Sequence, residues 1–98
     1  TKLNLEMGNT ADIVAIALDL RPHDACLVPE NRHEVTTEGG LDCVANRDAL
    51  APTIARLREA GTIVSLFIDP DPPQIRAAAD LQAEFIELHT GAFANASG

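Results

Sequence analysis

The chain has 98 residues, the length of one small domain, and an apolar share of 46% that makes extended disorder unexpected. Fifteen acidic residues against seven basic ones give a net charge of −8, which argues against nucleic acid as a partner. No apolar run approaches the roughly 18 residues of a membrane span, and no basic, apolar leader is visible. The chain begins with Thr1 rather than Met, so we expect a trimmed or internal piece.

Cysteine and histidine spacing gives no sign of a metal site. Cys26 and Cys43 fit no CxxC pattern, and we expect two reduced thiols in a cytoplasmic protein rather than a disulfide. His23, His33 and His89 are widely separated, and no HExxH motif occurs. Neither GxGxxG nor a P-loop is present, so the sequence predicts no metal and no nucleotide cofactor.

Four short apolar runs predict strands, and three helix-like stretches lie between them. The predicted strands are Leu3–Met7, Ala25–Pro29, Ile63–Asp69 and Phe85–His89. Strands that alternate with helices predict parallel strands joined by right-handed crossovers. The small, polar stretch 91–98 follows the last of them.

Local signals set the bounds of the three predicted helices. The first begins near Thr10 as N-cap and ends before Pro22. The second covers 47–60, with Gly61 as its C-terminal cap and Pro52 marking either a later start or a kink. The third opens with Asp71 as an acidic cap, followed by two prolines. The predicted buried stripes are Ile13, Ile16, Ala17 and Leu20, then Leu50, Ile54 and Leu57, then Ile75, Ala78 and Ala79.

The two faces of the predicted strands differ in polarity. One face is aliphatic, whereas the other carries polar groups toward the carboxyl ends of the strands. A doubly wound sheet is covered by helices on both faces, but a β/α barrel is covered on one and has its chemistry at the carboxyl ends. The sequence therefore favours a parallel α/β segment of a TIM-type barrel, with four strands and three helices of the eight each that a full barrel needs. We expect residues 1–98 to form one partial domain, incomplete without flanking segments.

Several polar residues at these strand ends are candidates for chemistry. Glu6 is a candidate general base, or alternatively a structural carboxylate paired with Lys2. Glu87 and His89 lie two apart on one strand and therefore face the same side, where they could transfer a proton or form a satisfied polar layer. Asp69 is expected to cap the turn that follows its strand.

The long irregular segment from Glu30 to Asn46 separates the second strand from the second helix. A loop of this length in a compact unit is often functional, and a lid over a site is one such role.

Four motifs in register resemble the pyridoxine 5′-phosphate synthase family over essentially the whole chain. They are Asn4-Leu-Glu-Met7, Cys26-Leu-Val-Pro-Glu30 with Glu34-Val-Thr-Thr-Glu-Gly-Gly-Leu-Asp42, Ser65-Leu-Phe-Ile-Asp69 and Phe85-Ile-Glu-Leu-His-Thr-Gly91. The resemblance implies a β/α barrel that condenses 1-deoxy-D-xylulose 5-phosphate with 3-amino-2-oxopropyl phosphate, without a metal or organic cofactor. It also implies a homo-oligomer, an octamer in the family.

The resemblance assigns roles to three residues. Glu6 corresponds to the family's catalytic glutamate that accepts a proton, and Glu87 to a glutamate that stabilises the reaction. Thr36 corresponds to a threonine that contacts the deoxyxylulose phosphate on a closing loop. The family's catalytic histidine segments and phosphate-binding loop do not occur here, so the chain resembles the third to sixth strands, and Arg32 and Arg47 are the nearest candidates for phosphate contacts.

Two other interpretations remain open. The chain could be a non-catalytic structural segment or assembly module, or a part of another barrel enzyme that acts on phosphorylated sugars.

Overall fold

A computed structural model of the protein describes residues 3–30, 34–36 and 39–88. Four strands and three helices alternate along the chain. They are β1 (Asn4–Met7), α1 (Ala11–Leu20), β2 (Asp24–Leu27), α2 (Arg47–Glu59), β3 (Ile63–Ile68), α3 (Pro72–Asp80) and β4 (Phe85–Leu88). All seven predicted elements are present, and their ends differ from the prediction by a few residues.

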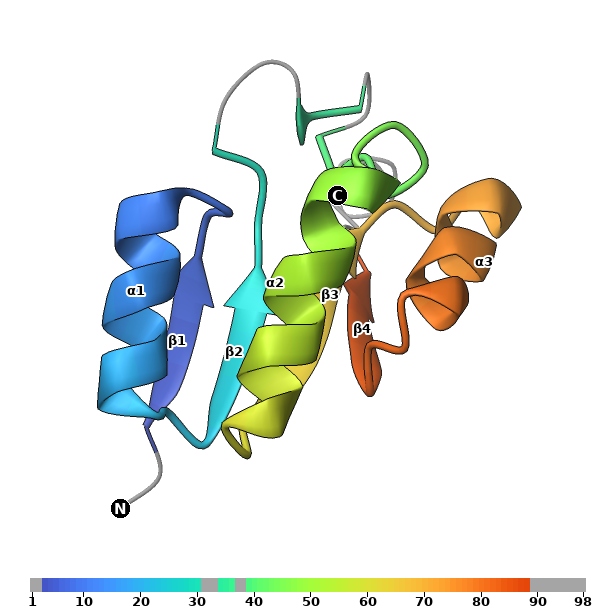
Figure 1. Ribbon diagram of the computed structural model, residues 1–98. Coiled ribbons are helices and arrows are strands. Elements are labelled where there is room, and N and C mark those ends of the chain that lie inside the picture. Colours follow the sequence, from blue (N-terminus) through green and yellow to red (C-terminus); the bar gives the residue numbers. More distant parts are fainter. Residues whose placement is uncertain (1–2, 31–33, 37–38, 89–98) are drawn as a thin grey trace, which may run out of the picture.

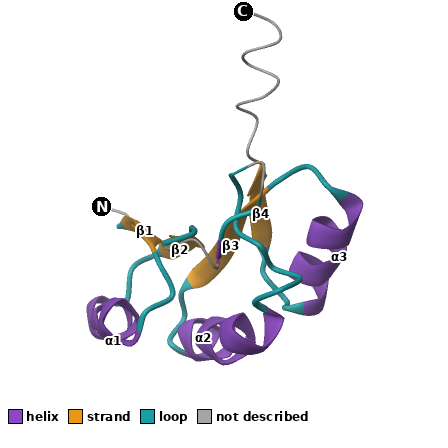
Figure 2. Cartoon of the chain, turned by 90° about the horizontal axis from the view of Figure 1, so that it is seen from above, coloured by secondary structure: helices purple, strands orange, loops and turns teal. Residues whose placement is uncertain are grey.

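The four strands form one parallel sheet in the order of the sequence, β1-β2-β3-β4 (Figure 1). All three helices lie on the same side of this sheet (Figure 2). A doubly wound sheet would carry helices on both faces and would reverse its strand order. Sequential parallel strands with helices on one face are instead the arrangement of a TIM-type β/α barrel, so the predicted fold class is confirmed.

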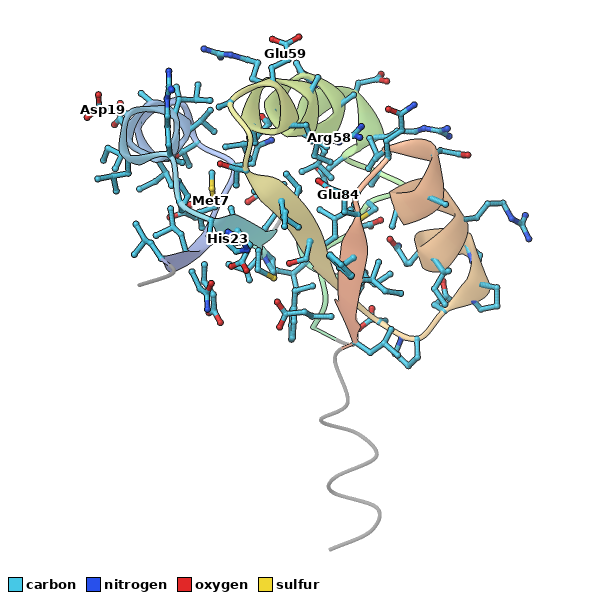
Figure 3. All side chains as sticks on the ribbon, turned by 90° about the horizontal axis from the view of Figure 1, so that it is seen from below. Met7, Asp19, His23, Arg58, Glu59 and Glu84 are labelled. Atoms are coloured by element: carbon cyan, nitrogen blue, oxygen red, sulfur yellow. The ribbon has the colours of Figure 1, made fainter. Side chains whose placement is uncertain are left out.

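The core lies between the sheet and the helices. On the covered face of the central strands, Ala25, Leu27, Val64, Leu66 and Ile68 are fully buried. Helix α2 adds its predicted stripe of Leu50, Ile54 and Leu57, each at most 1% exposed. Figure 3 shows Met7 between β1 and the helix layer, and Met7 belongs to the same buried cluster.

The predicted stripes of the other two helices are partly wrong. Ile16 and Leu20 of α1 are 51% and 53% exposed, whereas Val14 and Ala17 are buried. In α1 the apolar residues extend around more of the helix than its contacts with β1 and α2 can cover.

Helix α3 is rotated relative to its prediction. Ile75 is 40% exposed and Ala79 is also exposed, while Gln74, Ala77 and Ala78 are buried. The amide of Gln74 explains this orientation, because it accepts from the Cys43 amide N–H at 2.7 Å and donates to the Asp42 carboxylate at 2.9 Å. A polar contact with the long loop therefore takes the inward position that Ile75 was expected to occupy.

The helix ends follow local chemistry with two exceptions. The Thr10 hydroxyl accepts from the Ile13 amide at 3.3 Å, as expected of an N-cap. Gly61, with φ of 90°, follows α2, and its N–H donates to the Arg58 carbonyl at 2.9 Å in a left-handed C-terminal cap. Asp71 occupies the N-cap position of α3 but its side chain makes no capping bond, and α2 runs through Pro52 instead of beginning there.

The long loop between β2 and α2 is tied to the carboxyl end of β3. The Leu41 amide donates to the Phe67 carbonyl at 2.8 Å, and Val35 and Leu41 form an isolated antiparallel bridge. Within the loop, the Thr36 amide donates to the Gly40 carbonyl at 2.9 Å. The described part of the loop therefore packs against the strand ends.

Candidate active site

A row of polar side chains crosses the uncovered face of the sheet. Strand register places Glu6 of β1 beside Cys26 of β2, and Cys26 beside Ser65 of β3. The Ser65 hydroxyl donates to Oε2 of Glu87 on β4 at 3.4 Å, which extends the row to the fourth strand. We call these four residues the polar row; it spans the described sheet from edge to edge.

Two adjoining hollows on this face share members of the row. The larger, about 620 Å³, is lined by Glu6, Cys26, Ser65 and Glu87 together with residues from the amino ends of the strands. The smaller, about 310 Å³, is lined by Glu6, Cys26, Glu87, Phe67 and the Val28-Pro29 segment. The fold thus brings together the two glutamates that sequence reasoning singled out, although they lie on opposite edge strands.

The thiol of Cys26 lies between these two carboxylates. Burial raises its pKa from 9.0 to about 12, the Ser65 hydroxyl lowers it, and contact with Glu87 together with the charges of Glu87 and Glu6 raises it. A thiol with this pKa is protonated at neutral pH and is a poor nucleophile. It can still act as a weak hydrogen-bond donor, which is the role that suits a neighbour of two carboxylates.

Charge around the larger hollow is acidic. Among the described residues, its lining includes the acids Glu6, Asp24 and Glu87, and His23 is the one basic side chain (Figure 3 labels His23). Arg47, one candidate for a phosphate contact, lies instead in a groove between α2 and α3, where it pairs with Asp80 at 2.7 Å. Arg32, the other candidate, lies outside the described residues.

Thr36 lies apart from the polar row. Its hydroxyl donates a short hydrogen bond to the Asp69 carboxylate, and the Gly40 amide donates to the same carboxylate at 3.1 Å. Thr36 is not among the residues that line either hollow.

The prediction that Asp69 caps the turn after its strand is wrong, because its side chain has other partners. The side chain of Asp69 is 2% exposed and reaches a loop about thirty residues away in sequence instead of the turn that follows it. Gly40 permits this approach, because a Cβ at that position would lie 2.7 Å from the Asp69 backbone nitrogen.

The remaining sequence expectations concern His89, the cysteines and metals. His89 lies outside the described residues. Cys26 and Cys43 are both free thiols, as expected, and both are buried. Within residues 3–30, 34–36 and 39–88, no group of three or more His, Cys, Asp or Glu side chains could hold a metal ion. No helix in the described part of the chain is long and apolar enough to cross a bilayer.

Sequence reasoning missed Cys26 as a member of the site. In the sequence analysis, Cys26 is treated only as a partner for a disulfide or a metal. Because side chains alternate along a strand, its position between Ala25 and Leu27 in β2 predicts that it faces the uncovered side. The strand parity that singled out Glu6 and Glu87 was therefore sufficient to find it.

Comparison with known proteins identifies the family of this chain. The family model described as pyridoxal phosphate biosynthesis protein PdxJ matches residues 1–98. The chain belongs to the PdxJ family. Proteins similar to this chain include pyridoxine 5′-phosphate synthases from Gluconobacter oxydans, 64% identical over 92 residues, and Akkermansia muciniphila, 62% identical over 96 residues.

These relatives are longer than this chain. The matches cover 94% and 98% of this chain but only 40% and 39% of the two relatives. A third relative, from Thermosynechococcus vestitus, is 58% identical over all 98 residues, which is 41% of its own length. The chain therefore spans about two fifths of the length of the curated relatives that it matches.

Proposed function

We propose that this chain is the central part of a pyridoxine 5′-phosphate synthase in vitamin B6 biosynthesis. The reaction is the condensation of 1-deoxy-D-xylulose 5-phosphate with 3-amino-2-oxopropyl phosphate, which gives pyridoxine 5′-phosphate, inorganic phosphate and water. The observation that carries the proposal is the convergence of Glu6 and Glu87 on one uncovered pocket in a chain that matches PdxJ throughout.

The chemistry of the reaction requires groups that exchange protons. An amine adds to a ketone, water and phosphate leave, and a ring closes, so protons must be accepted and returned at several steps. In our proposal Glu6 accepts protons during these steps, and Glu87 stabilises cationic or protonated intermediates. Carboxylates held in a partly enclosed pocket are suited to both roles.

The remainder of the site comes from outside the described residues in this proposal. Two phosphorylated substrates need cationic donors, whereas the described lining of the larger hollow includes three acids and one basic residue, His23. Thr36 contacts the deoxyxylulose phosphate after its loop moves toward the pocket, and His89 adds a further polar group. We propose that flanking segments supply the phosphate-binding groups, the catalytic histidines and the other four strands.

The edges of the sheet support a partial barrel. Leu3 and Ile16 at the β1 edge are 47% and 51% exposed, and Ile86 and Leu88 on β4 are 38% and 43% exposed. Neighbouring strands and helices of a closed barrel would cover such side chains. The whole enzyme is proposed to be a cytoplasmic homo-oligomer.

Replacement of Glu6 tests the proposed function. In the complete synthase that contains this chain, Glu6→Gln should lower kcat about 10²–10⁴-fold, because the amide cannot accept a proton. The midpoint of thermal unfolding should stay close to that of the wild type, since Glu6 is exposed.

Glu59→Gln is the matched control. Glu59 lies on the outer side of α2, away from the uncovered face of the sheet (Figure 3), and its replacement should leave turnover unchanged. Near-normal turnover in the Glu6→Gln variant would contradict the proposed role of Glu6.

A further inference from the structure

The carboxylate of Glu87 needs support if it is to act at a defined point. Glu87 lies on β4, whose four residues are all exposed in the described part of the chain. A glutamate in that setting loses about 1–2 kcal/mol of side-chain entropy when it is fixed in one orientation. Directed hydrogen bonds to the carboxylate are the means by which a fold offsets that cost.

The polar row supplies such bonds from β3, which pairs with β4, and from β2, which pairs with β3. In the sheet register Glu87 lies beside Phe67, and Ser65 lies beside Phe85, so the Glu87 side chain reaches back by two positions to meet the Ser65 hydroxyl at 3.4 Å. Cys26 lies beside Ser65 in the register and lines both hollows together with Glu87. Strands β2 and β4 are two strand spacings apart, about 10 Å, and the Glu87 side chain spans part of that distance because it reaches over β3 to Ser65.

We propose that Ser65 and Cys26 are positioning residues, whose hydroxyl and thiol each donate to the Glu87 carboxylate and hold it in the pocket. The proposal rests on the function proposed above and adds two residues to its site. A thiol suits this position because it is 7% exposed and stays protonated beside two acids, where a second charged group would be repelled.

Kinetics of the complete synthase test the role of Ser65. Ser65→Ala should lower kcat about 5–20-fold with KM changed less than twofold, because the substrate still binds while the carboxylate is no longer oriented. Ser65→Thr keeps the hydroxyl on a strand that favours β-branched residues, and it should restore kcat to within about twofold of the wild type.

Thr62→Val is the matched control for the loss of a hydroxyl. Thr62 is buried, and its hydroxyl donates to the Pro22 carbonyl at 3.0 Å at the amino end of β3. This change should lower the unfolding midpoint without altering kcat. A Ser65→Ala variant with the kcat of the wild type would overturn the proposal.

Alkylation of the thiols gives a second readout that does not depend on activity. At a fixed pH between 8 and 9, Glu87→Gln should speed iodoacetamide labelling of Cys26 several-fold, because a negative neighbour of the thiolate is lost. Ser65→Ala should slow the same labelling, since the Ser65 hydroxyl stabilises the thiolate. Cys43 is the internal control, because burial and Asp42 raise its pKa to about 12 without any contribution from Glu87.

The two kinds of failure are distinguishable. A wild-type complete protein with no synthase activity would contradict the proposed function. An active wild type, an inactive Glu87→Gln variant and a fully active Ser65→Ala variant would overturn only the positioning role. Unchanged labelling of Cys26 in both variants would also overturn it, because the thiol would then not contact the carboxylate.

Discussion

The two faces of the sheet differ although the same strands form both. Leu27 and Leu66 on the covered face are fully buried beneath the helices. Their sequence neighbours Cys26 and Ser65 point to the opposite face, where they line the pocket with the two glutamates. Alternation along the strand therefore places adjacent residues on opposite faces, one in the buried core and the next in the pocket lining.

Asp69 qualifies this comparison. It continues the alternation of Ser65 and Phe67 on the uncovered side, yet it is 2% exposed because the loop that carries Thr36 and Gly40 packs over it. The uncovered face of the sheet is thus accessible along the strands, but the loop covers it at the carboxyl end of β3. Burial there depends on a loop instead of on a helix.

The largest expected effect comes from the covered face. Leu66→Ala should lower the free energy of unfolding by about 3 kcal/mol, because it leaves a cavity beneath the helices in a fully buried position. Ser65→Ala, one residue away on the other face, should cost about 0.5 kcal/mol. Urea unfolding of both variants measures the difference, and equal losses would contradict the separation of the two faces.

Asp69 should have an intermediate effect. Asp69→Ala removes the acceptor of the Thr36 hydroxyl and the Gly40 amide, and we expect a loss of about 2 kcal/mol from these charge-assisted bonds. Asp71→Ala is the control, because the Asp71 side chain makes no capping bond to α3, and it should cost below about 0.5 kcal/mol. Thermal unfolding compares the stabilities of the two variants. A loss of stability in Asp71→Ala as large as in Asp69→Ala would contradict a specific stabilising role of the loop contact.

The smallest expected effect is the pH dependence of stability caused by the two buried thiols. Cys26 lies on the uncovered face of the sheet, and Cys43 belongs to the core. The folded chain raises the pKa of Cys26 and of Cys43 from 9.0 to about 12, so each thiol keeps its proton when the unfolded chain loses it. Stability should therefore be intact well below pH 9 and fall as the pH rises from 9 to 12; between pH 8 and pH 10 the fall should be about 1.4 kcal/mol for each thiol.

Urea unfolding at pH 8 and pH 10 measures this fall. The chain contains no tyrosine and one lysine, so few other groups titrate in that range. A Cys26→Ala variant should show a smaller fall with pH, and a fall as steep as that of the wild type would exclude a contribution from Cys26.

Most of the fold was predictable because its signals are local. The order of strands and helices, the one-sided polarity of the strands and the Leu50, Ile54 and Leu57 stripe all follow from residues close together in sequence. Glu6 and Glu87 were found in the same way, from their parity on strands. Their positions suggest roles in proton transfer, the family resemblance makes these roles specific, and both roles stay predictions.

The errors arose where a distant contact decides the local orientation. The Gln74 amide turns α3 toward the long loop and leaves Ile75 exposed. Sequence alone expected Ile75 to face inward, because an apolar residue is the usual choice for a helix core. Similarly, Asp69 was expected to cap a nearby turn, and instead it binds a loop across the end of the sheet.

The sequence by itself determined which residues each strand turns to either face, since the side-chain period of two is a property of the extended backbone. Only the tertiary structure decided which polar residues meet. Parallel pairing puts Glu6, Cys26 and Ser65 in one row, and a hydrogen bond joins Glu87 to it, although 81 positions separate the two glutamates. Strand parity carries no information about such register, because register depends on how strands far apart in sequence align.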